Sequence, residues 1–351
     1  MNNLFSYLKW RGDLTFSHSP FNEIDNAILC AFSYIRIEDF IREKDIFSIQ
    51  ELYPMYQNSD KKESILLKNQ ETLFFLLSES MRFQNIKIAK LVKESSESSE
   101  KQFCAMTFIL NEEELFIAFR GTDSTLTGWK ENFNLSFLDE VPSQKRAVEY
   151  LEDIASLTKK NLIVGGHSKG GNLAMYSYVF CKKEVRKRIK TVYNNDGPGL
   201  TKKILEDENL KELEEKITTF LPKSSIIGNL FENDSEIKII KSNSIGILEH
   251  DLYTWKVEGN HFVYAKELDK KTKDLCVFLN EKINEIPNAK KKRIIDFIYD
   301  LLEYSGVGDI EEMVQNIGKK HSLLKKYNIS LEDMQFVWKI LPILVEIFKK
   351  L

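Results

Sequence analysis

The chain has 351 residues, of which 42% are hydrophobic and 11% aromatic, enough for one large domain with an appendage or for two domains. Its formal net charge of −3 at pH 7 gives no general attraction to nucleic acid or to anionic lipid, so we expect no nucleic-acid partner. The four cysteines are far apart among apolar residues and form no C-x-x-C motif, which favours buried free thiols over disulfides or a metal site.

The beginning of the chain lacks the features of an export signal. Residues 1–5 contain no basic stretch, and no long apolar run follows them. No run of about eighteen apolar residues occurs anywhere, so we expect no transmembrane helix. Together these features favour a cytoplasmic protein.

The first part of the chain is expected to be helical. Residues 1–20 are rich in aromatic side chains and are expected to pack on the domain as an ordered arm. Apolar residues at helical spacing over 21–32 predict a buried helix, and two further helices are expected at about 36–52 and 59–80. We expect these helices to cover one face of a sheet.

A change of period marks the start of that sheet. Residues 86–92 alternate as a strand does, and 93–100 form a polar connection rich in serine. Two further strands are expected at 103–110 and 115–119, with a turn at 111–114 between them. The sheet is therefore predicted to begin with antiparallel strands.

A glycine cluster around Ser168 is the strongest motif of the chain. A helix with Ser143 as its N-cap leads to the short apolar run 162–164, and a helix-forming run follows the glycines. Gly166-x-Ser168-x-Gly170 fits the nucleophile elbow, a strained turn that needs minimal side chains two residues before and two after the serine. The alternative is a glycine-rich strand–helix turn in another α/β protein.

Asp196 is the candidate acid. It follows an expected strand at 190–195, and the chain order Ser…Asp…His is that of α/β-hydrolases. The alternative is a structural residue in an Asp-Gly turn. Glu232 and Asp234 are weaker candidates, because they lie before a strand and not at its end.

His250 is the candidate base, and His261 is its rival. His250 lies in the loop after the last long strand expected, at 236–242, from which an imidazole can reach over the sheet edge to Ser168. His167 is adjacent to the serine in sequence but would point away from it in an elbow.

These motifs resemble a known family. The segment Arg120-Gly121-Thr122-Asp123 after a strand, followed by G-H-S-K-G-G-N-L-A, is similar to the class 3 (triacylglycerol) lipases, and with N-D-G-P-G and H-D-x-x-x-W it resembles a little-studied bacterial branch of lipase-like hydrolases over about residues 1–265. The resemblance implies an α/β-hydrolase fold, a mostly parallel central sheet flanked by helices. It also implies an oxyanion hole formed by the backbone N–H groups of Thr122 and Lys169, and a lid-like or acyl-facing segment over 126–142. Considered alone, R-G-T-D indicates only a tight turn.

The resemblance fails at the acid. Class 3 lipases place it one strand later, where this chain has serines and no carboxylate over 220–228. The acid is therefore Asp196, at the end of the earlier strand, or it is missing.

The sequence from 266 to 351 is expected to form a C-terminal all-helical region, separate from the hydrolase-like domain over 1–265. Helices are expected at 267–286, 293–304 and 309–327, and a very apolar one runs from 330 to the end. That last helix is expected to pack on the chain or on a second copy in a homodimer, with peripheral membrane contact as the alternative.

The sequence thus predicts a serine hydrolase of the esterase or lipase type that cleaves a small-molecule or lipid ester. Ser168 is the predicted nucleophile, His250 the base and Asp196 the acid, with the oxyanion held at Thr122 and Lys169. This chemistry needs no metal and no organic cofactor. The alternative is a non-catalytic lipid- or protein-binding module on a hydrolase scaffold, which the missing class 3 acid and the helical tail favour.

Overall fold

The computed structural model describes most of the chain. The described residues are 2–39, 41, 46–59, 65–123, 125–135, 138, 140–201, 215–230, 236–305, 325–330, 333–334 and 337. The helices expected at 309–327 and from 330 onward, and with them the proposed dimer or membrane contact, lie largely outside these residues.

Strands of the described residues form an eight-stranded sheet whose spatial order follows the chain order. They are β1 (Phe47–Ser48), β2 (Lys87–Ser96), β3 (Lys101–Ile109), β4 (Glu114–Phe119), β5 (Asn161–His167), β6 (Ile189–Asn195), β7 (Ile217–Pro222) and β8 (Glu236–Ile240). The pairs from β1 to β4 are antiparallel, and the pairs from β4 to β8 are parallel. The carboxyl ends of β4 to β8 therefore meet at one edge of the sheet.

The sheet has an apolar core on each face. Along β4, Phe116 and Ala118 belong to one cluster of buried residues, while Leu115, Ile117 and Phe119 belong to the other. This is the side-chain alternation of a strand, and because both sets are apolar the strand is buried from both sides. Helices must consequently cover both faces.

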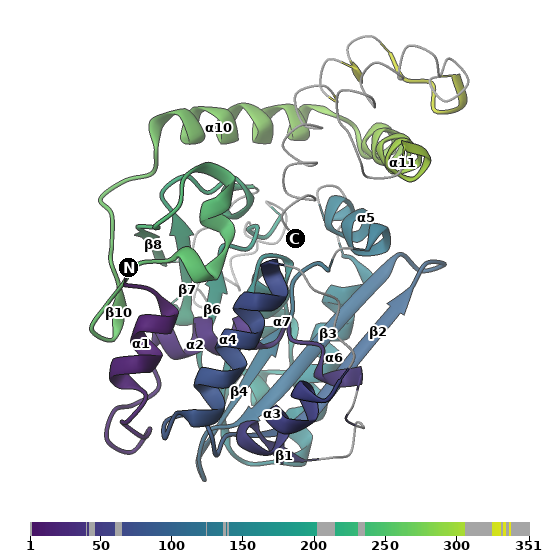
Figure 1. Ribbon diagram of the computed structural model, residues 1–351. Coiled ribbons are helices and arrows are strands. Elements are labelled where there is room, and N and C mark those ends of the chain that lie inside the picture. Colours follow the sequence, from purple (N-terminus) through teal and green to yellow (C-terminus); the bar gives the residue numbers. More distant parts are fainter. Residues whose placement is uncertain are drawn as a thin grey trace.

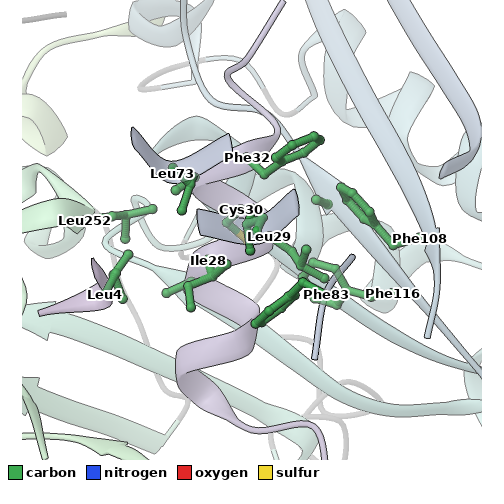
Figure 2. Packing of buried hydrophobic residues seen from close by; sticks show 14 of the residues in the cluster. Leu4, Ile28, Leu29, Cys30, Phe32, Leu73, Phe83, Phe108, Phe116 and Leu252 are labelled. Atoms are coloured by element: carbon green, nitrogen blue, oxygen red, sulfur yellow. The ribbon is translucent and has the colours of Figure 1, made fainter. Parts of the chain in front are cut away.

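Helices from the N-terminal part of the chain cover the first face (Figure 1). They are α1 (Leu4–Arg11), α2 (Glu23–Phe32), α3 (Ile49–Gln57) and α4 (Ile65–Glu79). Figure 2 shows this core, in which Ile28, Leu29 and Phe32 of α2 pack near Phe108 and Phe116 of the sheet.

The second face is covered by α6 (Pro142–Leu157) and α7 (Lys169–Phe180). The remaining helical elements are η1 (Ile37–Asp39), α5 (Leu126–Asn134), α8 (Lys183–Lys187), η3 (Ile227–Asn229), η4 (Gly246–His250), η5 (Leu252–Thr254), α10 (Lys270–Glu285) and α11 (Asn288–Ser305), and β9 (Val257–Glu258) pairs with β10 (His261–Phe262). In Figure 1, α10 extends across one end of the molecule, and α11 lies beside α5.

The architecture confirms the predicted α/β-hydrolase fold class, a mostly parallel sheet flanked by helices with further helices at the C-terminal side. All four cysteines are buried free thiols, as predicted. Among the helices that the structure describes, none is long and apolar enough to cross a bilayer.

Several predicted element boundaries were wrong, among them the start of α11 at Asn288 and not at 293. The helix expected at 36–52 is the short η1, then β1, and α3 starts only at Ile49, because Ser48 caps it with Glu51 in a capping box. The connection expected at 93–100 is largely strand, since β2 continues to Ser96 opposite β3. Ser143 is not an N-cap, because α6 already begins at Pro142, a residue suited to a first helical turn.

Candidate active site

Ser168 lies directly after β5, in the sharp turn that leads into α7. Its backbone φ of 57° is in the left-handed region that L residues rarely adopt. A Cβ on Gly166 would lie 2.0 Å from the Gly170 carbonyl oxygen, and one on Gly170 would lie 2.0 Å from the Phe119 carbonyl oxygen. Both positions therefore require glycine, as expected for a nucleophile elbow.

Parallel strands bring the predicted site residues to one edge of the sheet. Thr122 follows β4, Ser168 follows β5 and Asp196 follows β6, and these strands pair in parallel. The turns are tied together, because the Ser168 N–H donates to the Asn195 carbonyl at 3.0 Å and the Asp196 N–H donates to the Phe220 carbonyl at 2.9 Å.

The structure joins the candidate acid to the candidate base. His250 Nδ1 lies 2.6 Å from Asp196 Oδ2, and the two side chains are 9% and 1% exposed. A carboxylate only accepts hydrogen bonds, so Nδ1 carries a proton and Nε2 of the neutral ring carries a lone pair. Nε2 is buried and has no hydrogen-bond partner among the described residues, Ser168 included.

Asp196 is held by a second donor. The hydroxyl of Ser225 donates to Asp196 Oδ1, and Ser225 stands in the segment where class 3 lipases carry their acid. A Cβ on Gly228 would lie 2.5 Å from Asp196 Oδ1, so the backbone packs directly on the carboxylate. Thus the serine-containing segment holds the carboxylate of Asp196, the candidate acid.

Buried contacts also fix the loop that carries His250. The Trp255 indole donates to the Glu249 carbonyl at 2.8 Å. His167 Nε2 lies 2.8 Å from the His250 carbonyl, which can only accept, so His167 carries its proton on Nε2 and accepts from the Tyr34 hydroxyl at Nδ1. Burial lowers the pKa of His167 well below its usual range, and the nearby His250 ring lowers it further. His167 is therefore a neutral support of the His250 backbone.

The other candidate base and acids lie elsewhere. His261 is exposed on β10, where its Nδ1 lies 2.9 Å from the Phe262 carbonyl and its ring stacks on Tyr264. Glu232 and Asp234 lie outside the described residues. Of the two histidines considered as bases, the structure places His250 at Asp196.

Thr122 and Lys169 flank Ser168. Thr122 is 3% exposed, and its hydroxyl has no hydrogen-bond partner among the described residues. The Lys169 N–H is at the first position of α7, where N–H groups lack helical partners and favour negative charge. A Cβ on Gly121 would lie 3.1 Å from the Ser168 Cβ, so the turn that carries Thr122 packs against the elbow.

The side chain of Lys169 has a role that the sequence did not reveal. It is fully buried, and its ammonium donates to the Gln102 carbonyl at 2.6 Å, to Gln102 Oε1 at 2.8 Å and to Glu131 Oε2 at 2.8 Å. Glu131 belongs to α5, within the segment expected to be lid-like. Through Glu131, α5 is tied to the nucleophile helix.

A family model described as Mbeg1-like matches the chain over residues 77–300. The chain belongs to the Mbeg1-like family. The matched part of this Mbeg1-like chain runs from α4 into α11, so it contains Ser168, Asp196 and His250, together with α10. No curated protein matches the sequence.

The Mbeg1-like chain is also similar to solved lipases. A native lipase–propeptide complex from Rhizomucor miehei is 15% identical with a TM-score of 0.38, over 61% of this chain and 66% of that chain. The Lip2 lipase from Yarrowia lipolytica is 12% identical with a TM-score of 0.33, over 50% of this chain and 72% of that chain. Such low identities and scores do not transfer an activity from one chain to another.

Sequence reasoning on this Mbeg1-like chain did not find the residues that hydrogen-bond to the predicted site residues Asp196 and Lys169. Ser225, Gln102 and Glu131 are polar residues without a motif. One signal was present: Lys169 is the only charged residue of the helix that follows Ser168, and a lysine buried there requires an anion.

Proposed function

We propose that this Mbeg1-like chain is a serine hydrolase that cleaves carboxylic esters through an acyl-enzyme. The observation that carries the proposal is the 2.6 Å contact of His250 Nδ1 with Asp196 Oδ2, at the sheet edge where Ser168 occupies its strained turn. In serine hydrolases, a carboxylate fixes the tautomer of the histidine that activates the serine of the elbow.

In the proposed reaction, Ser168 Oγ attacks the ester carbonyl carbon and its proton passes to His250 Nε2. Asp196 orients the ring and stabilises the imidazolium that forms. The tetrahedral oxyanion is held by the backbone N–H of Lys169 and by Thr122, whose hydroxyl has no partner among the described residues. His250 then protonates the leaving alcohol, and a water molecule activated by the same ring hydrolyses the acyl-enzyme.

The absence of a Ser168–His250 hydrogen bond is compatible with this reaction, because such bonds are often long without substrate and tighten in the complex. The same observation, with Ser168 only 6% exposed, favours the second candidate, a non-catalytic lipid- or protein-binding module.

Two measurements separate these functions. Ser168→Ala is expected to abolish hydrolysis of p-nitrophenyl esters, because it removes the proposed nucleophile. The far-UV circular dichroism spectrum should be unchanged, because alanine differs from serine only by the lost hydroxyl group. A fluorophosphonate probe should label the wild type, and should fail to label Ser168→Ala and His250→Ala. Equal turnover in the Ser168→Ala variant refutes the assignment, and a folded wild type that is not labelled supports the binding module.

A further inference from the structure

Lys169 and Glu131 form a buried ion pair beside the nucleophile. Both side chains are 0% exposed, and Lys169 Nζ lies 2.8 Å from Glu131 Oε2. An ammonium has three protons, and the two acceptors on Gln102 use the others. All three N–H donors of the Lys169 ammonium are therefore used within the protein, and none is available to hydrogen-bond a substrate.

Glu131 has polar partners at both carboxylate oxygens. Its Oε2 accepts from the Gln102 N–H at 3.0 Å and from the Ser143 hydroxyl at 2.7 Å, and its Oε1 accepts from the Ser143 N–H at 2.9 Å. One carboxylate thus connects β3, the start of α6 and, through Lys169, the start of α7. Buried ion pairs contribute little net stability over apolar residues of similar size, so stability alone does not account for this one.

The pair links the two sides of the proposed oxyanion hole. Lys169, whose N–H is one proposed donor, follows Ser168 directly. Thr122, the other, lies just before α5, and a Cβ on Gly128 in the first turn of α5 would lie 3.1 Å from Thr122 Cγ2. Glu131 is one turn further along that helix. Because the first turn of α5 packs directly against Thr122, we infer that a shift of α5 away from Lys169 would also displace Thr122.

We propose that Glu131 is a positioning residue that sets the separation of the two oxyanion donors by anchoring α5 to the Lys169 side chain. The inference rests on the proposed hydrolase function. Because the ground-state ester makes weaker contacts with these donors than the transition state does, the pair acts on kcat more than on KM.

Glu131→Gln tests this directly, since it keeps the shape of the side chain and removes the charge that holds Lys169. We expect kcat for p-nitrophenyl butyrate to fall about 10- to 100-fold with KM within about twofold, as for a small displacement of catalytic donors. The rate constant for fluorophosphonate labelling of Ser168 should fall in parallel, because the phosphonyl oxygen occupies the same hole.

Asp25→Asn is the matched control. Asp25 pairs with Arg82, and both side chains are 0% exposed. Arg82 also donates to the carbonyls of Leu14 and Ser19 in the N-terminal arm, so this pair holds that arm and does not contact the proposed oxyanion donors. Both Asp25→Asn and Glu131→Gln should lower the melting temperature. Assayed well below that temperature, only Glu131→Gln should lower kcat.

A double variant, Lys169→Met with Glu131→Gln, removes both charges and so avoids an unpaired buried ammonium if Glu131→Gln does not fold. A folded double variant with low kcat and unchanged KM supports the inference. A wild-type kcat in either folded variant overturns it and leaves the hydrolase assignment intact. Failure of the fluorophosphonate to label Ser168 in the wild type is the distinct result that removes the hydrolase function, and this inference with it.

Discussion

Asp196 combines backbone strain with a carboxylate in which each oxygen has one polar partner. Its φ of 53° is left-handed, like that of Ser168, and such non-glycine residues cost about 1–3 kcal/mol each unless their surroundings hold them. The surroundings are present, because Oδ1 accepts from Ser225 and Oδ2 contacts His250. In this backbone conformation, one carboxylate oxygen faces Ser225 and the other faces His250.

Asp196→Asn should therefore act through the tautomer of His250. An amide NH₂ facing Nδ1 favours the tautomer with its proton on Nε2, which cannot accept from Ser168, so we expect kcat for p-nitrophenyl esters to fall about 1,000- to 10,000-fold. Ser225→Ala removes one hydrogen bond and keeps the carboxylate, and should cost only about tenfold. A loss from Ser225→Ala as large as that from Asp196→Asn would contradict a tautomer-setting role for Asp196.

At the residue scale, the site features that depend on neighbouring residues could be predicted from the sequence. The spacing of Gly166, Ser168 and Gly170 predicts a turn in which no other side chains fit, and the ends of successive strands pointed to Asp196. The partner of Lys169 could not be predicted in this way, because Glu131 is 38 residues away and reaches it only through the packing of α5.

Individual elements were predictable where burial on both sides dictates their residues. β4 is apolar after Glu114, and its position was found to within about a residue, whereas β5 begins beside the predicted run 162–164 but continues through two glycines to His167. β2 was cut short because Ser95 and Ser96 are polar, although they pair with β3, so the partner strand decides the length. The start of α3 did have a local signal, Ser48 with Glu51, that apolar periodicity alone overlooks.

The helices α10 and α11 contact two different segments next to the candidate site. In α10, the Asn280 amide donates to the Asn229 carbonyl at 3.0 Å, in the segment that follows β7 and contains Ser225. In α11, Asp296 lies 3.1 Å from Lys130 of α5. These helices therefore touch both the acid-supporting segment and the helix that carries Glu131 (Figure 1).

Asp296→Asn should loosen α11 from α5. Lys130 and Asp296 are 17% and 22% exposed, so their pair is worth at most about 1 kcal/mol. We expect faster amide hydrogen exchange in α11 and unchanged exchange in α2. In a cycle with Lys130→Gln, the double variant should lose less than the sum of the single losses. Strict additivity would show that the two residues do not interact.

At the scale of the whole molecule, the candidate site lies at the carboxyl edge of the sheet that separates the two apolar cores. Several ionisable groups are enclosed there, and burial raises the pKa of the Glu249 carboxyl while it lowers that of the His167 imidazole. These shifts have opposite effects on stability as the pH falls, so a single variant is needed to isolate either one.

His167 should make folding less stable in acid. The unfolded chain binds a proton at this residue below about pH 6.5, whereas the folded chain does so only at much lower pH, so its contribution falls with decreasing pH by up to about 1.4 kcal/mol per unit. His167→Gln removes this dependence. The difference in urea unfolding free energy between wild type and variant should shrink from pH 7 to pH 5, and a constant difference would show that His167 does not titrate as inferred.

The left-handed turn at Ser168 also affects which residues are expected at this position in other members of the family. The backbone there, with a φ of 57°, suits glycine better than a residue with a side chain, so under the proposed function the serine is kept for turnover and not for stability. A gene copy released from that selection gains stability when glycine replaces the serine. If the proposed function holds, Mbeg1-like proteins with glycine at this position would be members that lack the ester hydrolysis proposed for this chain and keep its fold.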